Sequence, residues 1–296
     1  MPCRSRRARN ITRVTGALVL AGGGVAGIAW ELGVLRGIQD VAPDTIARVL
    51  GPSTTFVGTS AGSSVAAQLA SGLPLETLFE TQLAEKSGEL DPDIDIAVVI
   101  QAFTEAVTGA TSEEDRRKRM GAVARAAKTV PQSVRREVIA SRLPSHEWSE
   151  RRVIITAVDA DSGELRAFDR DSGVDLVDAV SASCAVPGVW PTVEIEGRRY
   201  MDGGSRSIAN ADLAAGSDPV LILVPGPEES PLGPAIPQSE FDALAPAAIL
   251  TILTDEASLA AFGMNPLDPA TRRPSALAGR EVGRRMAGAV TDFWRI

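Results

Sequence analysis

Histidine, cysteine and tyrosine are scarce in this chain of 296 residues, which has one histidine (His146), two cysteines (Cys3 and Cys184) and one tyrosine (Tyr200). Structural zinc sites and iron–sulfur clusters need several Cys or His ligands, so the composition excludes them. Two cysteines form at most one bridge, which excludes a disulfide framework. Any chemistry that the protein performs must therefore use one imidazole or none.

Basic residues are also few outside the N-terminus. The formal net charge is −8, but residues 1–13 hold five arginines and no acid, so the rest of the chain has 25 basic and 38 acidic side chains and a net charge of −13. An acidic body argues against a nucleic-acid partner, because phosphate contacts need a positive surface. We expect residues 1–14 to form a basic, disordered arm, with contact to anionic lipid or another acidic partner as the alternative.

Long apolar runs are missing too. The sequence has no stretch of eighteen apolar residues, so we expect no membrane-spanning helix. The arm followed by residues 14–21 imitates a signal peptide, but the apolar run is short and leads directly into a glycine motif that needs it as a strand. We therefore expect a cytoplasmic protein, peripheral to the membrane at most.

Strand and helix patterns alternate along the chain. Short apolar runs predict strands over 17–21, 54–57, 152–158, 165–168, 192–195, 199–201 and 220–224. Helical spacing or composition predicts helices over 28–39, 63–69, 74–142 (several), 174–183, 240–261 and 275–294. This alternation predicts an α/β fold with three layers, α/β/α, around a mainly parallel central sheet. We divide the chain into the arm, a main domain over 15–225, and a loop and helices over 226–296 packed on the same domain.

The first motif is Gly22-Gly23-Gly24-Val25-Ala26-Gly27, between a predicted strand and a predicted helix. Glycines allow positive φ and leave main-chain N–H groups free to point at a negative oxygen near a helix N-terminus. The motif also fits the dinucleotide fingerprint, which needs an acid at the end of the second strand about twenty residues later. Asp44 is nearly at that distance, but it follows Pro43 and no strand pattern precedes it. A dinucleotide-binding oxidoreductase is therefore the less favoured alternative.

The second motif is Gly58-Thr59-Ser60-Ala61-Gly62, a G-x-S-x-G pentapeptide between the strand 54–57 and the helix 63–69. A serine on such a turn is strained, and its neighbours must be small so that strand and helix can approach. The N–H of Ala61 and the helix N-terminus can stabilise an oxyanion. A serine N-cap on an ordinary helix is the alternative, but the pattern favours Ser60 as a nucleophile.

A nucleophilic serine needs a base. In α/β-hydrolases a histidine follows the acid, whereas His146 lies in a proline-containing surface connection and no later histidine exists. The third motif, Tyr200-Met201-Asp202-Gly203-Gly204, places an acid at the end of a strand, from which it can reach the edge where α/β sites form. The pKa of a free Asp is about 3.9, and burial would raise it. A plain hairpin exit is the alternative for Asp202.

The three motifs, in this order, resemble the patatin-like phospholipase family, lipid acyl hydrolases that use a Ser–Asp dyad without histidine. The resemblance spans roughly residues 16–225 and implies a patatin-like fold, Ser60 as nucleophile and Asp202 as general base. It also implies an oxyanion hole from the N–H groups of Gly22, Gly23 and Gly24, and no metal or organic cofactor. The residues that it implies as supports of the motifs are Gly27, Gly58, Ala61, Gly62, Gly203 and Gly204.

Two further segments bear on the resemblance. The family often has Asn-x-Pro after its Asp-Gly element, whereas here Asn210 is followed by Ala211-Asp212, so we assign no role to Asn210. The small-residue run 181–188 is similar to a family segment near the site. Within it we interpret Cys184 as a packing residue, since no basic neighbour is visible that would lower its pKa.

The resemblance predicts a serine esterase of lipid acyl esters, of phospholipase A, lysophospholipase or esterase type, acting through an acyl-enzyme. Transfer of the acyl group to an alcohol would instead make an acyltransferase. A non-catalytic membrane-associated module is a further alternative, because the last predicted helix is basic through Arg272, Arg273, Arg280, Arg284 and Arg285. No pattern predicts the head group, the chain length or the oligomeric state.

Overall fold

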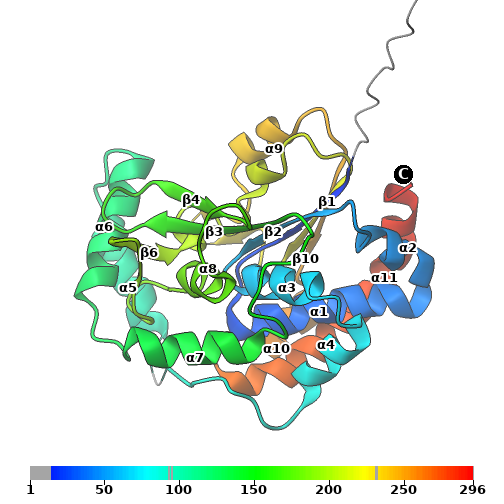
Figure 1. Ribbon diagram of the computed structural model, residues 1–296, viewed down its shortest axis with the longest axis horizontal. Helices are drawn as coiled ribbons and strands as arrows, with labels where there is room; N and C mark the ends of the chain where they lie inside the picture. The colour runs from blue at the N-terminus through cyan, green and yellow to red at the C-terminus, as the bar shows by residue number, and fades with distance from the viewer. Residues whose placement is uncertain (1–14, 93, 95, 231–232, 296) are drawn as a thin grey trace, which may run out of the picture.

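The computed structural model describes residues 15–295 except 93, 95, 231 and 232. The predicted arm, including Cys3, lies outside the described residues. A central sheet lies between layers of helices, with the C-terminal helix α11 beside α1 on one side of the sheet (Figure 1).

The central sheet has eight strands in the order β10-β7-β1-β2-β3-β6-β5, with β4 paired to β3. Strands β10, β7, β1, β2 and β3 are parallel, whereas the pairs β3–β4, β3–β6 and β5–β6 are antiparallel. The strands are β1 (Ala17–Leu20), β2 (Thr55–Thr59), β3 (Val153–Asp159), β4 (Leu165–Phe168), β5 (Val193–Ile195), β6 (Arg198–Asp202), β7 (Val220–Val224) and β10 (Ile249–Leu253). A separate ribbon pairs β8 (Glu229–Ser230) with β9 (Gly233–Pro234).

Most helices lie in the predicted segments with small changes at their ends, whereas α2 was not predicted. They are α1 (Gly24–Val41), α2 (Pro43–Val49), α3 (Ala61–Ala70), α4 (Leu75–Leu83), α5 (Ile96–Val107), α6 (Glu113–Ala126), α7 (Gln132–Arg142), α8 (Leu176–Ser183), α9 (Gln238–Leu244), α10 (Glu256–Phe262) and α11 (Arg272–Phe293). Three short 3₁₀ turns are η1 (Gly203–Ser205), η2 (Ala211–Ala214) and η3 (Pro269–Thr271). Within the described part of the chain, no helix combines the length and the apolar character needed to cross a bilayer.

Alternate residues of the buried strands face opposite layers, as the two-residue period of a strand requires. On β1, Leu18 and Leu20 pack into the cluster formed with α1, α3, α8 and α11. Ala17 and Val19 pack on the other face, against η2 and α9. Helix α6 packs on β3 and β6 through Met120. The predicted three-layer α/β/α fold with a mainly parallel sheet is therefore confirmed.

The segment after β7 differs from the prediction of one helical region over 240–261. Helix α9 ends at Leu244, Pro246 follows, and the chain then forms β10, which pairs parallel with β7 at the edge of the sheet. Proline lacks a backbone N–H and disfavours a helix, and the β-branched residues Ile249, Thr251 and Ile252 suit a strand. The helix prediction is thus wrong at its centre.

Helices α1 and α11 cross with their backbones in contact. A Cβ added to Gly37 would lie 2.0 Å from the carbonyl oxygen of Arg280, and one added to Gly283 would lie 2.0 Å from that of Val34. No side chain larger than hydrogen fits at either position. The crossing holds the C-terminal helix against the helix that begins at the glycine motif.

Candidate active site

Strand β3 brings the ends of β2 and β6 together. Along one edge of β3, Thr156 pairs with Thr59, the last residue of β2, and the next residue, Ala157, pairs with Asp202, the last residue of β6. The two strands run toward each other because β2 is parallel and β6 antiparallel to β3, while β4 occupies the opposite edge. Ser60, which follows Thr59, therefore lies next to Asp202.

Ser60 occupies a sharp turn between β2 and α3. Its φ of 52° and ψ of −113° form a left-handed conformation that a residue with a side chain adopts only under constraint. Ser60 is 8% exposed, and its backbone N–H donates to the Ser183 hydroxyl over 2.9 Å. A Cβ added to Gly62 would lie 1.9 Å from the Leu20 carbonyl oxygen. The close approach of α3 to β1 therefore requires the small residue that the motif supplies.

The Asp202 carboxyl is buried beside the Ser60 hydroxyl. Its Oδ1 accepts a hydrogen bond of 2.8 Å from the Gly204 N–H, whereas Oδ2 has no partner of good hydrogen-bond geometry among the described residues. Burial raises the pKa of Asp202 to about 6, against the opposing effect of hydrogen bonding from Ser60 and Gly204. The positive charge of Arg135 lowers this pKa further, by a smaller amount. Such a carboxylate is still ionised at neutral pH and is a stronger base than an exposed aspartate.

Asn210 links the two loops that bear these side chains. It is fully buried, and its Nδ2 donates to Thr59 Oγ1 over 3.1 Å and to the Gly203 carbonyl over 3.2 Å. One of these partners precedes Ser60 and the other follows Asp202. The sequence shows no sign of this role for Asn210, because its hydrogen bond to Thr59 joins residues about 150 positions apart and no spacing rule indicates it.

The glycine motif forms the turn from β1 into α1 and lies against Ser60. The Gly22 N–H donates to the Ile208 carbonyl over 2.9 Å, so it is not available to a substrate. This hydrogen bond corrects the expectation that Gly22 contributes to an oxyanion hole. The N–H groups of Gly23 and Gly24 have no hydrogen-bond partner in the described part of the chain, and they lie at the start of α1, where negative charge is favoured.

A small cavity of about 20 Å³ opens at Ser60. Its walls come from the glycine motif, α3, α7, the segment after α8 and the loop before η3. The lining residues are Gly24, Val25, Ser60, Ala61, Arg135, Arg142, Cys184, Val186, Trp190 and Leu267. Because at least about 10–15 Å³ is needed to hold one water molecule, a cavity of about 20 Å³ has room for about one water and not for an acyl chain. A lipid ester can therefore reach Ser60 only after some of these walls move.

Cys184 is buried below Ser60, with its Sγ 3.2 Å from the Ser60 carbonyl oxygen. Arg142 Nη1 lies 3.8 Å from the same sulfur, so the expectation that no basic group neighbours Cys184 is wrong. Helix α7 brings this arginine from 42 residues away. Burial outweighs the charge and raises the pKa of the Cys184 thiol, which therefore stays an uncharged packing residue.

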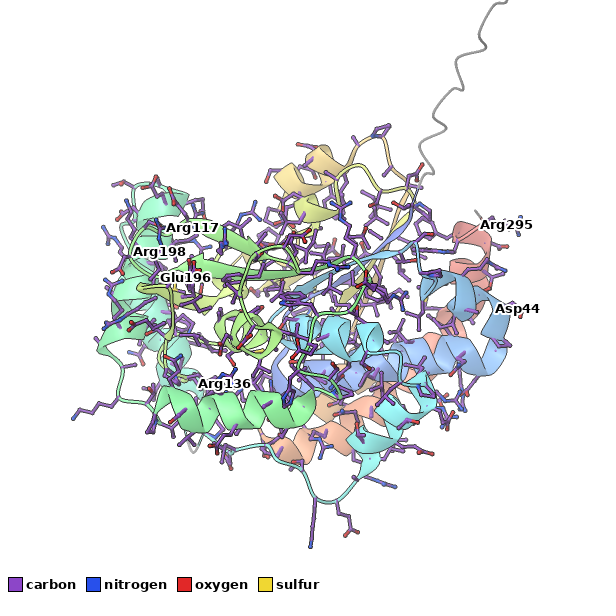
Figure 2. All side chains as sticks on the ribbon, in the orientation of Figure 1. Asp44, Arg117, Arg136, Glu196, Arg198 and Arg295 are labelled. Carbon is purple, nitrogen blue, oxygen red and sulfur yellow. The ribbon has the colours of Figure 1, made fainter. Side chains whose placement is uncertain are left out.

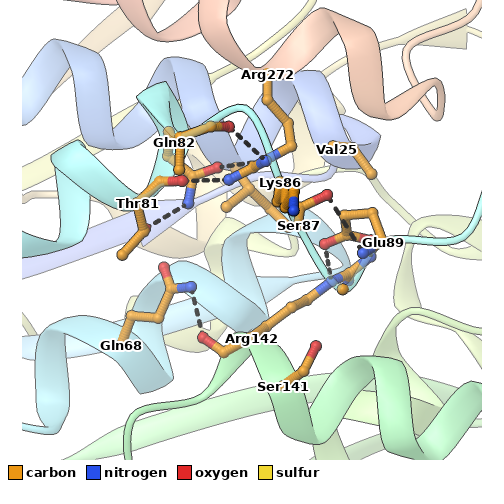
Figure 3. A pocket seen from close by; sticks show the side chains of 13 residues that line it. Val25, Gln68, Thr81, Gln82, Lys86, Ser87, Glu89, Ser141, Arg142 and Arg272 are labelled. Carbon is orange, nitrogen blue, oxygen red and sulfur yellow. Dashed lines mark hydrogen bonds and ion pairs between the residues drawn. The ribbon is translucent and has the colours of Figure 1, made fainter.

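A second cavity, of about 330 Å³, lies beside the Ser60 cavity and shares Val25 and Arg142 with it. Figure 3 shows its polar lining, in which Arg142 faces Glu89 and Arg272 reaches the residues of α4. The Arg142 guanidinium donates two hydrogen bonds of 2.7 Å to the Glu89 carboxylate. Arg272 donates to Gln82 and to backbone carbonyls. Both arginines of this cavity are thus partnered within the protein.

The single histidine lies outside both cavities. His146 is exposed in the loop after α7, and its Nε2 lies 3.1 Å from the Ala140 carbonyl oxygen. The predicted surface position of His146 is confirmed. No other imidazole exists in the chain, and the carboxyl group next to the Ser60 hydroxyl is that of Asp202.

Asp44 does not fit the dinucleotide interpretation. It is an exposed residue in the first turn of α2 and precedes β2 rather than following it. Figure 2 labels it at the periphery of the molecule. The acid that binds a ribose in that fold stands at the end of the second strand, where this chain has Ser60.

The solved structures that are similar to this chain include two with low sequence identity. One is VipD from Legionella pneumophila, with 14% sequence identity, a TM-score of 0.45, and coverage of 93% of this chain and 67% of that chain. The other is the type III effector protein ExoU, with 16% identity, a TM-score of 0.44, and coverage of 96% of this chain and 54% of that chain. The chain thus spans about half to two thirds of their lengths. Among curated protein sequences, none matches.

The family model of the patatin-like phospholipases matches residues 18–215, which is more than half of the chain. The match includes all three motifs: the glycine turn, the pentapeptide around Ser60 and the Asp202-Gly203-Gly204 element. These are the segments that β1, β2 and β6 bring to one place in the fold. The chain therefore belongs to the patatin-like phospholipase family of lipid acyl hydrolases.

Proposed function

We propose that the protein hydrolyses acyl esters of lipids through a Ser60–Asp202 dyad. The main support is the meeting of a strained, buried serine with a buried carboxyl at the facing ends of β2 and β6. Oδ2 of Asp202, without a well-formed hydrogen bond to any described residue, is available to accept the hydroxyl proton. Membership of the family supports the class of substrate, and the absence of histidine from the site supports aspartate as the base.

In the first half-reaction, Ser60 Oγ attacks the ester carbonyl carbon while Asp202 accepts the hydroxyl proton. The carbonyl oxygen becomes an oxyanion, which the N–H groups of Gly23 and Gly24 and the N-terminus of α3 stabilise. The tetrahedral intermediate then collapses. The alcohol leaves with the proton from Asp202, and the acyl group remains on Ser60.

In the second half-reaction, Asp202 takes a proton from water, whose oxygen attacks the acyl carbon. The second tetrahedral intermediate releases the fatty acid, and the proton returns to Ser60. None of these steps requires a metal or an organic cofactor. A lipid substrate implies transient contact with a membrane or micelle surface.

Labelling with a fluorophosphonate probe tests the proposal, because such probes react covalently with an activated serine. We expect mass-spectrometric mapping to find the label on Ser60, and Ser60→Ala to remove it. Asp202→Asn should slow the labelling by on the order of 10²-fold or more, since general-base assistance is lost. Heat-denatured protein controls for unspecific reaction. Folded protein, verified by circular dichroism, that takes no label on Ser60 contradicts the proposal.

A further inference from the structure

Arg135 is a buried cation in the Ser60 cavity that lacks a hydrogen-bonded partner. It is 5% exposed, yet its Nε and Nη1 donate no hydrogen bond to any described residue. Arg142, on the same helix and in the same cavity, is in contrast paired with Glu89. Buried charges in proteins are nearly always paired, so an unpaired one points to a group that arrives from outside.

The guanidinium of Arg135 is held in place by Trp190. Its central carbon lies 3.8 Å from the centre of the indole ring, a cation–π arrangement that fixes the plane of the group and leaves its N–H edges free. The indole Nε1 of Trp190 is also buried and makes no hydrogen bond to the described residues. The walls of one cavity thus contain two neighbouring side chains with unused buried donors, next to the nucleophile.

The surroundings of Arg135 favour an added negative charge. Burial lowers the pKa of Arg135 to about 9, and the nearby positive charge of Arg142 acts in the same direction. The negative charges of Glu89 and, to a smaller extent, Asp202 raise this pKa in part, but Glu89 is hydrogen-bonded to Arg142, and neither carboxylate makes a hydrogen bond with Arg135 in the described structure. An anion that accepts from Nε and Nη1 would remove the cost of the unpaired cation.

We infer that Arg135 is a substrate-binding residue that receives the phosphoryl group of a glycerophospholipid whose acyl ester lies at Ser60. The inference rests on the proposed function. A short glycerol unit joins the two groups in such a lipid, so one site can hold both, and guanidinium binds phosphoryl oxygens through two parallel hydrogen bonds. The adjoining polar cavity of about 330 Å³ offers room for the head group beyond the phosphoryl group.

The test compares two substrates with the same acyl chain, lysophosphatidylcholine and a monoacylglycerol, which differ in the phosphoryl head group. Arg135→Met keeps an unbranched side chain over Trp190 and removes the charge. We expect kcat/KM for the lysophospholipid to fall by about 10- to 100-fold, the usual effect of losing a charged hydrogen bond. The value for the monoacylglycerol should stay within a few-fold. The assays are run at pH 8, where Asp202 is ionised in both proteins.

Arg136→Met is the matched control, since Arg136, which Figure 2 labels, is the next residue of α7. Its guanidinium pairs with Asp178 of α8. It should leave both substrates unaffected. Thermal unfolding separates binding from a structural role. Removal of an unpaired buried cation should not lower the Tm, whereas loss of a structural arginine would.

Three results would overturn the inference while leaving the proposed function intact: an equal loss with both substrates, no loss with the lysophospholipid, or a clear fall in Tm for Arg135→Met. Wild-type hydrolysis of the monoacylglycerol without the lysophospholipid would do the same. If the wild-type protein hydrolyses neither ester, the proposed function itself fails.

Discussion

At the residue scale, burial raises the pKa of Asp202 and thereby links the proposed base to the stability of the fold. The pKa of Asp202 is raised above that of the unfolded chain. The Asp202 carboxyl therefore stabilises the folded protein at a pH below its unfolded pKa, where it is protonated. This stabilisation is lost as the pH rises through about 6. In the proposed mechanism the ionised form of Asp202 accepts the Ser60 proton, and this is the form that folding disfavours, as is common at catalytic sites.

The pH dependence of hydrolysis follows from this carboxyl. We expect kcat/KM for a neutral p-nitrophenyl ester to fall about tenfold per pH unit below a pKa near 6, because protonated Asp202 cannot accept the hydroxyl proton. Rates measured between pH 4.5 and 8, with circular dichroism to verify folding, give the profile.

Two variants distinguish this carboxyl from an imidazole with a similar pKa. His146→Ala should leave the acid limb of the profile, that is, the fall of kcat/KM below a pKa near 6, at the same pH, because His146 is exposed and outside the cavity. Arg135→Met should shift it to higher pH, because the charge of Arg135 lowers the pKa of Asp202. A limb that moves with His146 and not with Arg135 would contradict the assignment.

Individual residues differ in how far the sequence could predict them. Ser60 and Asp202 stand in turns with a strong local pattern, so their neighbours in sequence indicate them. The hydrogen bond from Gly22 to Ile208, the link through Asn210 and the position of Arg135 depend on contacts between distant segments. Helix α7 has no motif, and its place beside Ser60 follows from packing alone.

At the element scale, β3 determines the geometry of the site. The predicted strands were correct one by one, but the sequence contains no sign that β6 would continue the edge of β3 where β2 ends. The turn between β5 and β6 reverses the chain so that Asp202 meets Ser60 from the opposite direction. Register of this kind depends on packing over the whole sheet.

Strand β10 shows the limit of reasoning from apolar periodicity. Residues 249–253 form a short apolar run, and such a run cannot be assigned to helix or strand from its period. The prediction of one helical region over 240–261 included these residues, although Pro246 and the β-branched residues favour a strand between α9 and α10. Pairing with β7 decided the outcome.

The crossing of α1 and α11 gives a prediction for stability. We expect Gly37→Ala to lower the free energy of unfolding by about 1–3 kcal/mol, since its Cβ would lie 2.0 Å from the Arg280 carbonyl oxygen and the helices would have to separate. Gly288→Ala, on α11 with no atom within 4 Å of the added Cβ, should instead stabilise by roughly 0.5–1 kcal/mol through helix propensity. Urea denaturation of both variants measures the difference, and equal effects of the two would contradict the close crossing.

At the scale of the whole molecule, the C-terminal segment is part of the fold. It adds β10 to the sheet and α11 to one layer. Arginines of α11 that suggested a membrane-binding face are engaged within the protein: Arg280 and Arg284 pair with Asp40, and Arg285 pairs with Asp255. The hydrogen bond from Arg280 is the largest of the effects that lower the pKa of Asp40 to about 2. These ion pairs weaken the case for a membrane-binding face on α11, although Arg273 is exposed and, among the described residues, donates only to the Leu83 carbonyl.

The groups around Ser60 lower the stability of the fold, and packing in the rest of the molecule compensates for them. A left-handed serine, a buried carboxyl without a full set of hydrogen bonds and an unpaired buried arginine lie around one small cavity. The five parallel strands and the close contact of α1 with α11 supply the packing that holds these groups in place. Burial of strain and charge in this arrangement is what a preorganised site requires.

The most direct test of the dyad is the initial rate of acyl ester hydrolysis by purified, folded Asp202→Asn and His146→Ala proteins. We predict that His146→Ala retains the wild-type rate within a few-fold, because the His146 side chain is exposed and outside the cavity. For Asp202→Asn we predict a rate lower by on the order of 10²- to 10⁴-fold, because the amide cannot accept the Ser60 proton. An inactive but folded His146→Ala, or an Asp202→Asn protein with the wild-type rate, would contradict the dyad.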